Sequence, residues 1–201
     1  MYRLSPQVHL VLASASPRRR RMLSQLGLDF TLAPTQVDED LLPDEDAAEA
    51  VQRLAALKAA AAAPAWPGAV ILAADTLVTL DGRILGKPRD RDQAREMLRS
   101  LCGREHQVVT GFCLRHHQGQ DQGLARSRVR LRRLEAEEME AYLDSGESLD
   151  KAGAYAVQGL GQALVESVSG SYTNVVGLPL SMVVATMLQR GIIQPLRRSK
   201  P

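Results

Sequence analysis

Hydroxyl and guanidinium groups gather directly after the first apolar run of the chain, in the sequence SASPRR at 14–19. Ser16 is a favourable helix cap and Pro17 suits the first helical turn, so a helix is expected to begin here. A helix N-terminus favours an anion, and Arg can grip phosphate by two parallel hydrogen bonds. The candidate phosphate-binding residues are Ser14, Ser16, Arg18 and Arg19. A capped surface helix with a solvated basic run is the alternative.

Carboxylates occur at two places where they could act on a ligand. Asp75, followed by Thr76, comes directly after the apolar run AVILAA, which predicts a strand buried on both faces. Beyond the end of such a strand, a carboxylate can hold a hard divalent cation or act as a general base. Asp38 and Glu39 lie in an acidic loop or strand over 31–46 and could complete a Mg²⁺ or Mn²⁺ site shared with substrate phosphates. The alternatives are a turn-forming Asp75 and a solvated acidic loop.

Two lysines stand where a fixed positive charge would be useful. Lys87 lies between Gly86, which permits close approach of the backbone, and Pro88, which fixes the backbone. An ammonium so placed acts as a point charge for phosphate, although a solvated lysine at a hairpin end has the same pattern. Lys58 falls on an otherwise apolar stripe of the Ala-rich helix expected over 46–63, so it either extends to water or points into a site.

The run KAGAYAVQG at 151–159 predicts an ordered loop suited to a nucleobase. Its small residues let a base pack against backbone, and Gln158 offers both a donor and an acceptor to the edge of the base. A tight structural loop is the alternative. The sequence has no Walker A motif or GxGxxG turn, and its four histidines show no metal-ligand spacing. The chemistry indicated is metal-assisted hydrolysis without a covalent intermediate.

The elements that must position these groups alternate between strand and helix early in the chain, and a hairpin follows. This order predicts an α/β fold with a mixed sheet. The hairpin turns at Asp81-Gly82, which is a strong turn signal. The expected strands cover 9–14, two arms within 68–88, 105–115, 123–134 and 163–170. The expected helices cover 16–27, 46–63, 90–101, 135–144 and 178–190.

The composition fits one folded unit. A chain of 201 residues suits one large domain or two small lobes, and 45% hydrophobic residues are enough for a substantial core. A net charge of +2 argues against a dedicated nucleic-acid binder. Nucleic-acid binding stays open as a further class, although alternating arginines on a strand are typical of a solvated edge face. The arginines that motivate this class are Arg126, Arg128, Arg130, Arg132 and Arg133, and alternation places the first four on one strand face.

The sequence points to neither a membrane nor an oxidising compartment. Cys102 and Cys113 make no disulfide framework, so two reduced thiols are expected. The positive charges at 18–21 follow the first apolar run instead of preceding it, and no apolar run approaches the ~20 residues of a membrane span. We therefore expect a cytoplasmic protein whose last residues, 192–201, are flexible.

Six segments resemble, in the same order, those of the Maf nucleotide pyrophosphatases. They are LASASPRR at 12–19, AADT at 73–76, ILGKP at 84–88, LCGREHQVVTG at 101–111, DKAGAYAVQG at 150–159 and GSYTNVVGLPL at 170–180. The resemblance extends over about 10–190, and six ordered segments are far more specific than one. It implies a single domain over 1–201, related in fold to inosine triphosphate pyrophosphatases, with two lobes around a cleft.

The resemblance also implies hydrolysis of a nucleoside triphosphate between its α and β phosphates. Asp75 matches the catalytic proton acceptor of the family. The specificity positions of the family correspond to Arg18, Thr76 and Gln158. Its charged cleft residues correspond to Arg19, Glu39, Lys58 and Lys87. The AGAY…Q pattern resembles the branch that acts on dTTP and UTP, whereas the branch that acts on 7-methyl-GTP usually differs there.

These correspondences complete the expected site. Asp75 and Glu39 would hold Mg²⁺ or Mn²⁺, and Lys58 and Lys87 would join Asp75 as catalytic groups. The substrate would be the only partner apart from a homodimer, which is expected from the family alone. The family is also associated with arrest of septum formation, so a nucleotide-binding regulator without turnover is the rival function.

Two positions depart from the family pattern. Arg21 stands where the family often has Glu, a change that could remove a salt bridge. Cys102 stands where Ser is usual. Neither position is expected to touch the chemistry.

Overall fold

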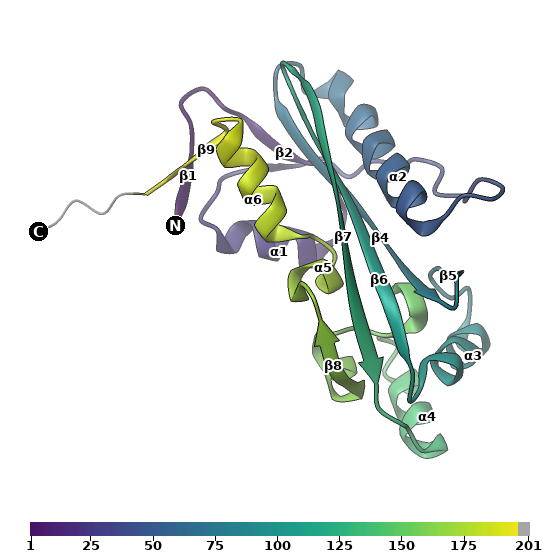
Figure 1. Ribbon diagram of the computed structural model, residues 1–201. Helices are drawn as coiled ribbons and strands as arrows, with labels where there is room; N and C mark the ends of the chain where they lie inside the picture. Colours follow the sequence, from purple (N-terminus) through teal and green to yellow (C-terminus); the bar gives the residue numbers. More distant parts are fainter. Residues whose placement is uncertain (197–201) are drawn as a thin grey trace, which may run out of the picture.

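The computed structural model describes residues 1–196, and residues 197–201 lie outside the description. A seven-stranded sheet runs through the molecule in the order β3-β2-β4-β6-β7-β8, with β5 paired to β4 (Figure 1). Its strands are β2 (Leu10–Leu12), β3 (Thr31–Leu32), β4 (Val70–Leu80), β5 (Arg83–Leu85), β6 (Glu105–His116), β7 (Gly119–Leu131) and β8 (Val165–Ser169). The α-helices are α1 (Pro17–Gln25), α2 (Ala47–Ala62), α3 (Arg91–Leu101), α4 (Ala136–Asp144), α5 (Tyr172–Val176) and α6 (Leu180–Gln189).

The sheet is parallel at one end and antiparallel over most of its width. β2 pairs in parallel with β3 and with β4. From β4 onward, β6, β7 and β8 follow one another in antiparallel order. The α/β fold with a mixed sheet is therefore confirmed.

β4 changes partner along one of its edges. On one side it pairs with β6 from Ile71 to Thr79. On the other side it pairs with β2 over residues 70–72 and with β5 over residues 78–80. β5 returns along β4 because Asp81 and Gly82 both adopt positive φ angles, 50° and 78°, as a tight hairpin turn requires. Within residues 1–196, no strand pairs with 73–77 at this edge, so the edge is open there.

Helix α2 covers one face of the sheet at short range. Ala55 and Ala59 are fully buried in the core that this helix forms with the strands. A Cβ placed on Gly111 of β6 would lie 2.6 Å from the backbone oxygen of Val51, so the close approach requires glycine. Small side chains on both elements thus hold α2, and every side chain it directs at the sheet, against β4 and β6.

The opposite face carries two separate cores. Leu12, Leu23 and Leu178 belong to the first, which packs α1 and α6 on the sheet. Leu98 and Leu143 belong to the second, which packs α3 and α4 there. Figure 1 shows α1 and α6 beside one half of the long strands and α3 and α4 at their far end. These two groups are the two lobes, and the open edge of β4 lies between them.

Several elements differ from the sequence-based expectation. β4 continues through Asp75, which is paired with Gly111, whereas the strand was expected to end before it. The reason is that β6 supplies partners along the whole of β4, although β2 ends early. The connection between β6 and β7 is also tighter than expected, because His116 and Gly119 are already paired. Three short elements without an apolar pattern were not foreseen, namely α5, β1 (Tyr2–Leu4) and β9 (Ile193–Pro195), whereas β3 lies at the start of the segment expected as a loop or strand over 31–46.

The two termini of the described chain meet. β1 and β9 form a two-stranded antiparallel sheet, and Ile193 is buried. Residues 193–195 are therefore not part of the flexible tail predicted over 192–201, and 197–201 lie outside the described residues. No helix within residues 1–196 has the length and apolar character needed to cross a membrane.

Candidate active site

A cavity of about 730 Å³ opens where the edge of β4 is free between β2 and β5. This volume falls in the range typical of small-molecule sites. The expected site residues that line it are Ser14, Ser16, Arg18, Arg19, Glu39, Lys58, Asp75, Thr76, Lys87 and Gln158. Six segments distant in sequence thus contribute to one cavity, as predicted.

Three charged groups meet on the α2 side of the cavity. The ammonium of Lys58 lies 2.5 Å from Oδ1 of Asp75 and 2.7 Å from Oε1 of Glu39. Lys58 and Asp75 are only 8% and 7% exposed, so this pair is well removed from water. Lys58 therefore points into the site, which decides between the two interpretations of a lysine on an apolar helix stripe. Glu39 reaches the pair from the loop before α2.

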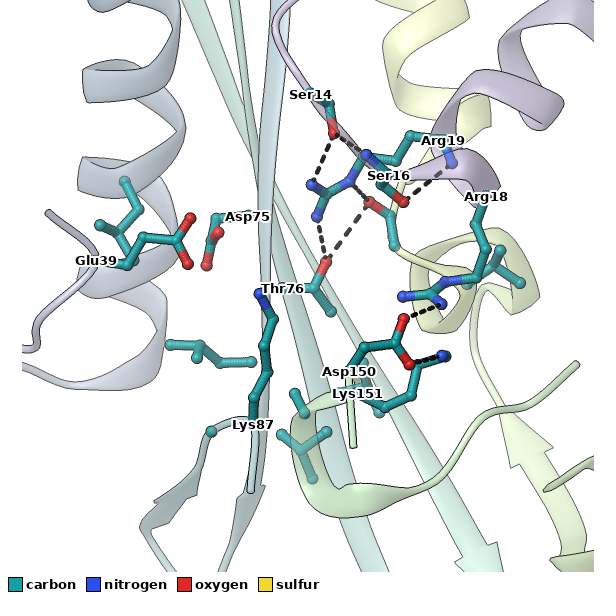
Figure 2. A pocket seen from close by; sticks show the side chains of 18 of the residues that line it. Ser14, Ser16, Arg18, Arg19, Glu39, Asp75, Thr76, Lys87, Asp150 and Lys151 are labelled. Atoms are coloured by element: carbon teal, nitrogen blue, oxygen red, sulfur yellow. Dashed lines mark hydrogen bonds and ion pairs between the residues drawn. The ribbon is translucent and has the colours of Figure 1, made fainter. Parts of the chain in front are cut away.

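The charges around the cavity lower the pKa of Glu39. Burial by itself would raise the pKa of Glu39, but the hydrogen bond and the charge of Lys58 lower it. The charges of Lys87 and Arg19 act in the same direction, so the pKa falls below its ordinary value of 4.5. Lys87 is exposed at the cavity, and Figure 2 shows its side chain pointing toward Asp75 and Thr76.

Arg19 is held on the opposite side of β4 by neutral acceptors. Nε donates to the carbonyl of Gly177 at 2.7 Å, Nη1 to Ser14 at 3.4 Å and Nη2 to Thr76 at 3.0 Å (Figure 2). Ser16 caps α1 and so directs the start of that helix, with Arg19, at the cavity. Burial lowers the pKa of Arg19 and the charge of Asp75 opposes this, yet a guanidinium stays protonated in proteins.

The mouth of the cavity joins the two lobes through an ion pair. Nη1 of Arg18, in α1, lies 4.0 Å from Oδ2 of Asp150, which also pairs with its neighbour Lys151. Gly153, two residues further on, has φ of +71° and donates from its N–H to the carbonyl of Gly86 at 3.1 Å. This contact ties the 151–158 loop to the segment that carries Lys87.

Gln158 lies at the far end of the same loop, where it is half-buried and lines the cavity. Tyr155 lies in the loop as well, and its hydroxyl meets Nε2 of His106 at 2.7 Å. Gln158 thus lies on the cavity wall at the end of a loop that Tyr155 anchors in the core.

The carboxylates of the cavity could supply only some of the ligands that a metal ion needs. The described residues contain no group of three or more His, Cys, Asp or Glu side chains arranged to hold a metal. Asp38, a further expected ligand, accepts instead from the backbone N–H of Asp40 at 2.9 Å. Glu39 and Asp75 fit Mg²⁺ or Mn²⁺ because such ions are commonly held by one or two carboxylates together with substrate phosphates.

Sequence reasoning missed four groups of this site. Thr110, the carbonyl of Asn174 and the carbonyl of Gly177 support Thr76 and Arg19, and Asp150 pairs with Arg18. A threonine within the apolar run of β6 was the available signal for Thr110. Backbone carbonyls carry no signal in the residue types, so their contribution appears only in the folded chain.

The two departures from the family pattern lie away from the cavity. Arg21 is exposed on α1 and makes no ion pair with any residue in 1–196. Cys102 ends α3 and is half-buried, and burial raises the pKa of its thiol. Neither residue lines the cavity, in agreement with the expectation that neither touches the chemistry.

Fold and site together define an α/β protein whose two lobes enclose a cavity with fixed cations and carboxylates. The chain belongs to the Maf-like protein family, whose model matches residues 9–190. It is 50% identical over 195 residues to a dTTP/UTP pyrophosphatase of Myxococcus xanthus, covering 96% of this chain and 98% of that one. It is 47% identical over 184 residues to a dTTP/UTP pyrophosphatase of Symbiobacterium thermophilum, covering 90% and 94%.

A solved structure shares the fold at low sequence identity. The Ham1 protein of Staphylococcus aureus matches with a TM-score of 0.55 and 14% identity, covering 90% of this chain and 99% of that chain. At this identity the likeness shows the fold alone, and it agrees with the architecture expected from the sequence.

Proposed function

We propose that this protein hydrolyses dTTP and UTP to the nucleoside monophosphate and pyrophosphate. The observation that carries the proposal is the shared cavity, in which Asp75 and its ion-paired neighbours face the fixed cation of Arg19 across one strand. The names of the relatives, at up to 50% identity over nearly the whole chain, supply the substrate class.

In this proposal a water molecule attacks the α phosphorus. Asp75 accepts a proton from that water, and a new bond forms between the water oxygen and the α phosphorus. The bond from the α phosphorus to the oxygen bridging to the β phosphorus breaks, and pyrophosphate leaves with the electron pair. Lys58 lies 2.5 Å from Asp75 and fixes the carboxylate in place for this step.

Positive side chains offset the charge of the triphosphate. The cations reach the cavity from both lobes, Arg18 and Arg19 from one and Lys87 from the other. They can therefore contact different phosphates of one nucleotide. Charges that are already in position stabilise a phosphoryl-transfer transition state without a reorganisation cost. Arg19 has one N–H left on each Nη nitrogen after its contacts with the protein, and these two donors suit a phosphate.

The proposal includes a divalent cation, Mg²⁺ or Mn²⁺, held by Glu39 and Asp75. When bound, such an ion supplies further positive charge to the phosphate oxygens. Glu39 and Asp75 already share the positive charge of Lys58, which supports their ability to gather around a cation. The base would be read by the amide of Gln158 and the backbone of its loop.

The experiment is a pyrophosphate-release screen over common and modified nucleoside triphosphates with Mg²⁺, repeated in water enriched in ¹⁸O. We expect turnover in excess of protein, highest with dTTP and UTP and dependent on the metal. Attack at the α phosphorus places the ¹⁸O in the monophosphate, whereas attack at the β phosphorus would place it in pyrophosphate and contradict the mechanism. Nucleotide binding without turnover would favour the rival function of a regulator.

The remaining partners also belong to the proposal. We expect a cytoplasmic protein that acts on no nucleic acid, and we expect a homodimer, which light scattering would test. Several arginines of the expected basic face are paired with carboxylates, Arg128 with Glu105 and Arg130 with Glu166. Such pairing supports a solvated face, and salt-sensitive retention on DNA or RNA would contradict it.

A further inference from the structure

We infer that Thr110 is a positioning residue for nucleotide binding, because its buried hydroxyl fixes the direction of a hydrogen-bond chain that holds Arg19. The inference rests on the proposed function, since it concerns the same cavity. Thr110 is 0% exposed and stands behind Thr76, to which it is directly paired in the β4–β6 ladder. Its effect on a ligand must therefore pass through Thr76 and Arg19.

The hydrogen-bond chain consists of three consecutive contacts. Nη2 of Arg19 lies 3.0 Å from Oγ1 of Thr76. Oγ1 of Thr76 lies 2.9 Å from Oγ1 of Thr110. Oγ1 of Thr110 lies 3.0 Å from the backbone carbonyl of Asn174. The hydrogen-bond chain thus joins four segments of the protein, which belong to α1, β4, β6 and α5.

The chemistry of the two ends allows one direction only. A carbonyl accepts and cannot donate, so the single proton of the Thr110 hydroxyl goes to Asn174. Thr110 must then accept the proton of Thr76. A guanidinium donates and cannot accept, so the lone pair left on Thr76 receives Nη2 of Arg19. Thr110 consequently turns the hydroxyl of Thr76 into an acceptor directed at Arg19.

Without the hydroxyl of Thr110, the hydroxyl of Thr76 would donate to a different acceptor. The carbonyl of Gly177 lies 3.5 Å from Oγ1 of Thr76. That same carbonyl accepts from Nε of Arg19 at 2.7 Å. A carbonyl oxygen has two lone pairs, so Thr76 could share this acceptor with Arg19, but its hydroxyl would then be turned away from the orientation that Thr110 sets. Thr110 therefore keeps Thr76 oriented as an acceptor for Arg19.

The end of the hydrogen-bond chain at Asn174 is held in place by further hydrogen bonds. Asn174 is 0% exposed, and its Nδ2 donates to the carbonyl of Val108 at 3.0 Å and to Oγ of Ser127 at 2.9 Å. Gly177 has φ of +119°, in the left-handed region that favours glycine, which turns its carbonyl toward Arg19. The core thus fixes the carbonyls that anchor the hydrogen-bond chain, and Thr110 connects this fixed end to the cavity.

The test uses Thr110→Val, which removes the hydroxyl at nearly constant shape, and Thr110→Ser, which keeps the hydroxyl. The dissociation constant of α,β-imido-dTTP, a non-hydrolysable probe, is measured by calorimetry with Mg²⁺, together with KM and kcat for dTTP. We expect Thr110→Val to raise both the dissociation constant and KM about tenfold with kcat changed less than threefold, because a contact made in the ground state is weakened. Thr110→Ser should stay within about twofold of the parent.

A matched control separates positioning from general damage. Ser100→Ala also removes a hydroxyl that donates to a backbone carbonyl, that of Met97 at 2.7 Å, but it lies in α3 and does not line the cavity. We expect this variant to bind the probe within about twofold of the parent, even where its melting temperature falls as much as that of Thr110→Val. Should Thr110→Val fail to fold, Thr110→Ala removes the same hydroxyl and is measured against the same expectations.

A double-mutant cycle decides the route of the effect. In a Thr76→Val background, adding Thr110→Val should change the dissociation constant less than about twofold, because the link to Arg19 is already broken. An undiminished tenfold change in that background, or parent-like binding by Thr110→Val alone, would overturn the inference. Failure of the proposed function shows differently, as the absence of pyrophosphate from the parent protein with every nucleotide.

Discussion

Asp75 and Thr76 are neighbours in β4 and point to opposite faces of the sheet, where they meet different kinds of partner. On the α2 side, two carboxylates share the single ammonium of Lys58, so this group carries a net negative charge. On the α1 side, the guanidinium of Arg19 is held by hydroxyl and carbonyl oxygens, and no direct ion pair with any residue in 1–196 neutralises its positive charge. One strand thus places a site suited to a cation beside a site suited to an anion.

A single strand can thus carry residues for two different tasks on its two faces. Successive side chains of a strand point to opposite faces, so adjacent residues reach different layers without any special backbone geometry. The open edge of β4 then lets both groups face one cavity. Under the proposed function, proton transfer and cation binding would occur on the α2 side, and phosphate binding on the α1 side.

The largest effect should come from the α2 side. Asp75→Asn keeps the shape of the side chain but removes the proton acceptor, and we expect kcat for dTTP to fall by about 10²–10⁴-fold. Lys58 keeps its contact with Glu39 at 2.7 Å in this variant, so folding should be retained. Asp81→Asn, the same change in the turn of the same hairpin, should keep parent activity. Turnover by Asp75→Asn near the parent rate would remove the assigned role.

An intermediate effect is expected on the α1 side. Arg19→Lys keeps the charge but cannot reach three acceptors and a phosphate together, so kcat/KM should fall about 10–100-fold. Arg20→Lys is the matched control, because Arg20 is exposed on the same helix and does not line the cavity. Equal losses in the two variants would mean that general charge, not the fixed guanidinium, matters.

A titration sharpens the α2 side. The pKa of Glu39 lies below 4.5 in the folded protein, because the effect of burial is outweighed by the hydrogen bond and charge of Lys58 together with the charges of Lys87 and Arg19. Its ionised form therefore adds stability above pH 4.5, and this contribution is lost as the pH falls through the lowered pKa. In Lys58→Met, the carboxyl carbon of Glu39 followed by NMR should titrate at a higher pH than in the parent. An unchanged midpoint would show that Lys58 does not control this carboxylate.

The smallest effect is expected at the mouth of the cavity. Asp150 is exposed and lies 4.0 Å from Arg18, so it competes weakly with a phosphate for that arginine. Asp150→Asn should lower KM for dTTP about two- to threefold at low ionic strength, and the difference should vanish near 0.5 M salt, roughly, because exposed charges are screened. A lower KM that persists at high salt would point to a direct contact instead.

Residue types and spacing predicted most of this site but not its internal order. Lys58 on an apolar helix stripe left two interpretations open, and the position of Asp75 within β4 was wrong because β6 extends the strand beyond β2. Thr110 was missed because a buried hydroxyl gains its role from a cross-strand partner. The carbonyl of Gly177 is a backbone group, and tertiary packing alone sets where it points.

The sheet was predictable where hydrophobic patterns were long. β4, β6 and β7 follow extended apolar or alternating runs, and the Asp81-Gly82 turn has a strong local signal. β1, β3 and β9 have two or three residues each, and α5 has five, which is too short for periodicity to show. Such elements depend on tertiary contacts, as β1 does on its pairing with β9.

The central claim is that both sides of β4 act on one triphosphate, and a crystal structure with α,β-imido-dTTP and Mg²⁺ tests it most directly. We predict the α phosphate beside Asp75 and the other phosphates within hydrogen-bond distance of Arg19 or Lys87. A triphosphate bound outside the cavity, or held on the α1 side with its α phosphate turned away from Asp75, would contradict the account.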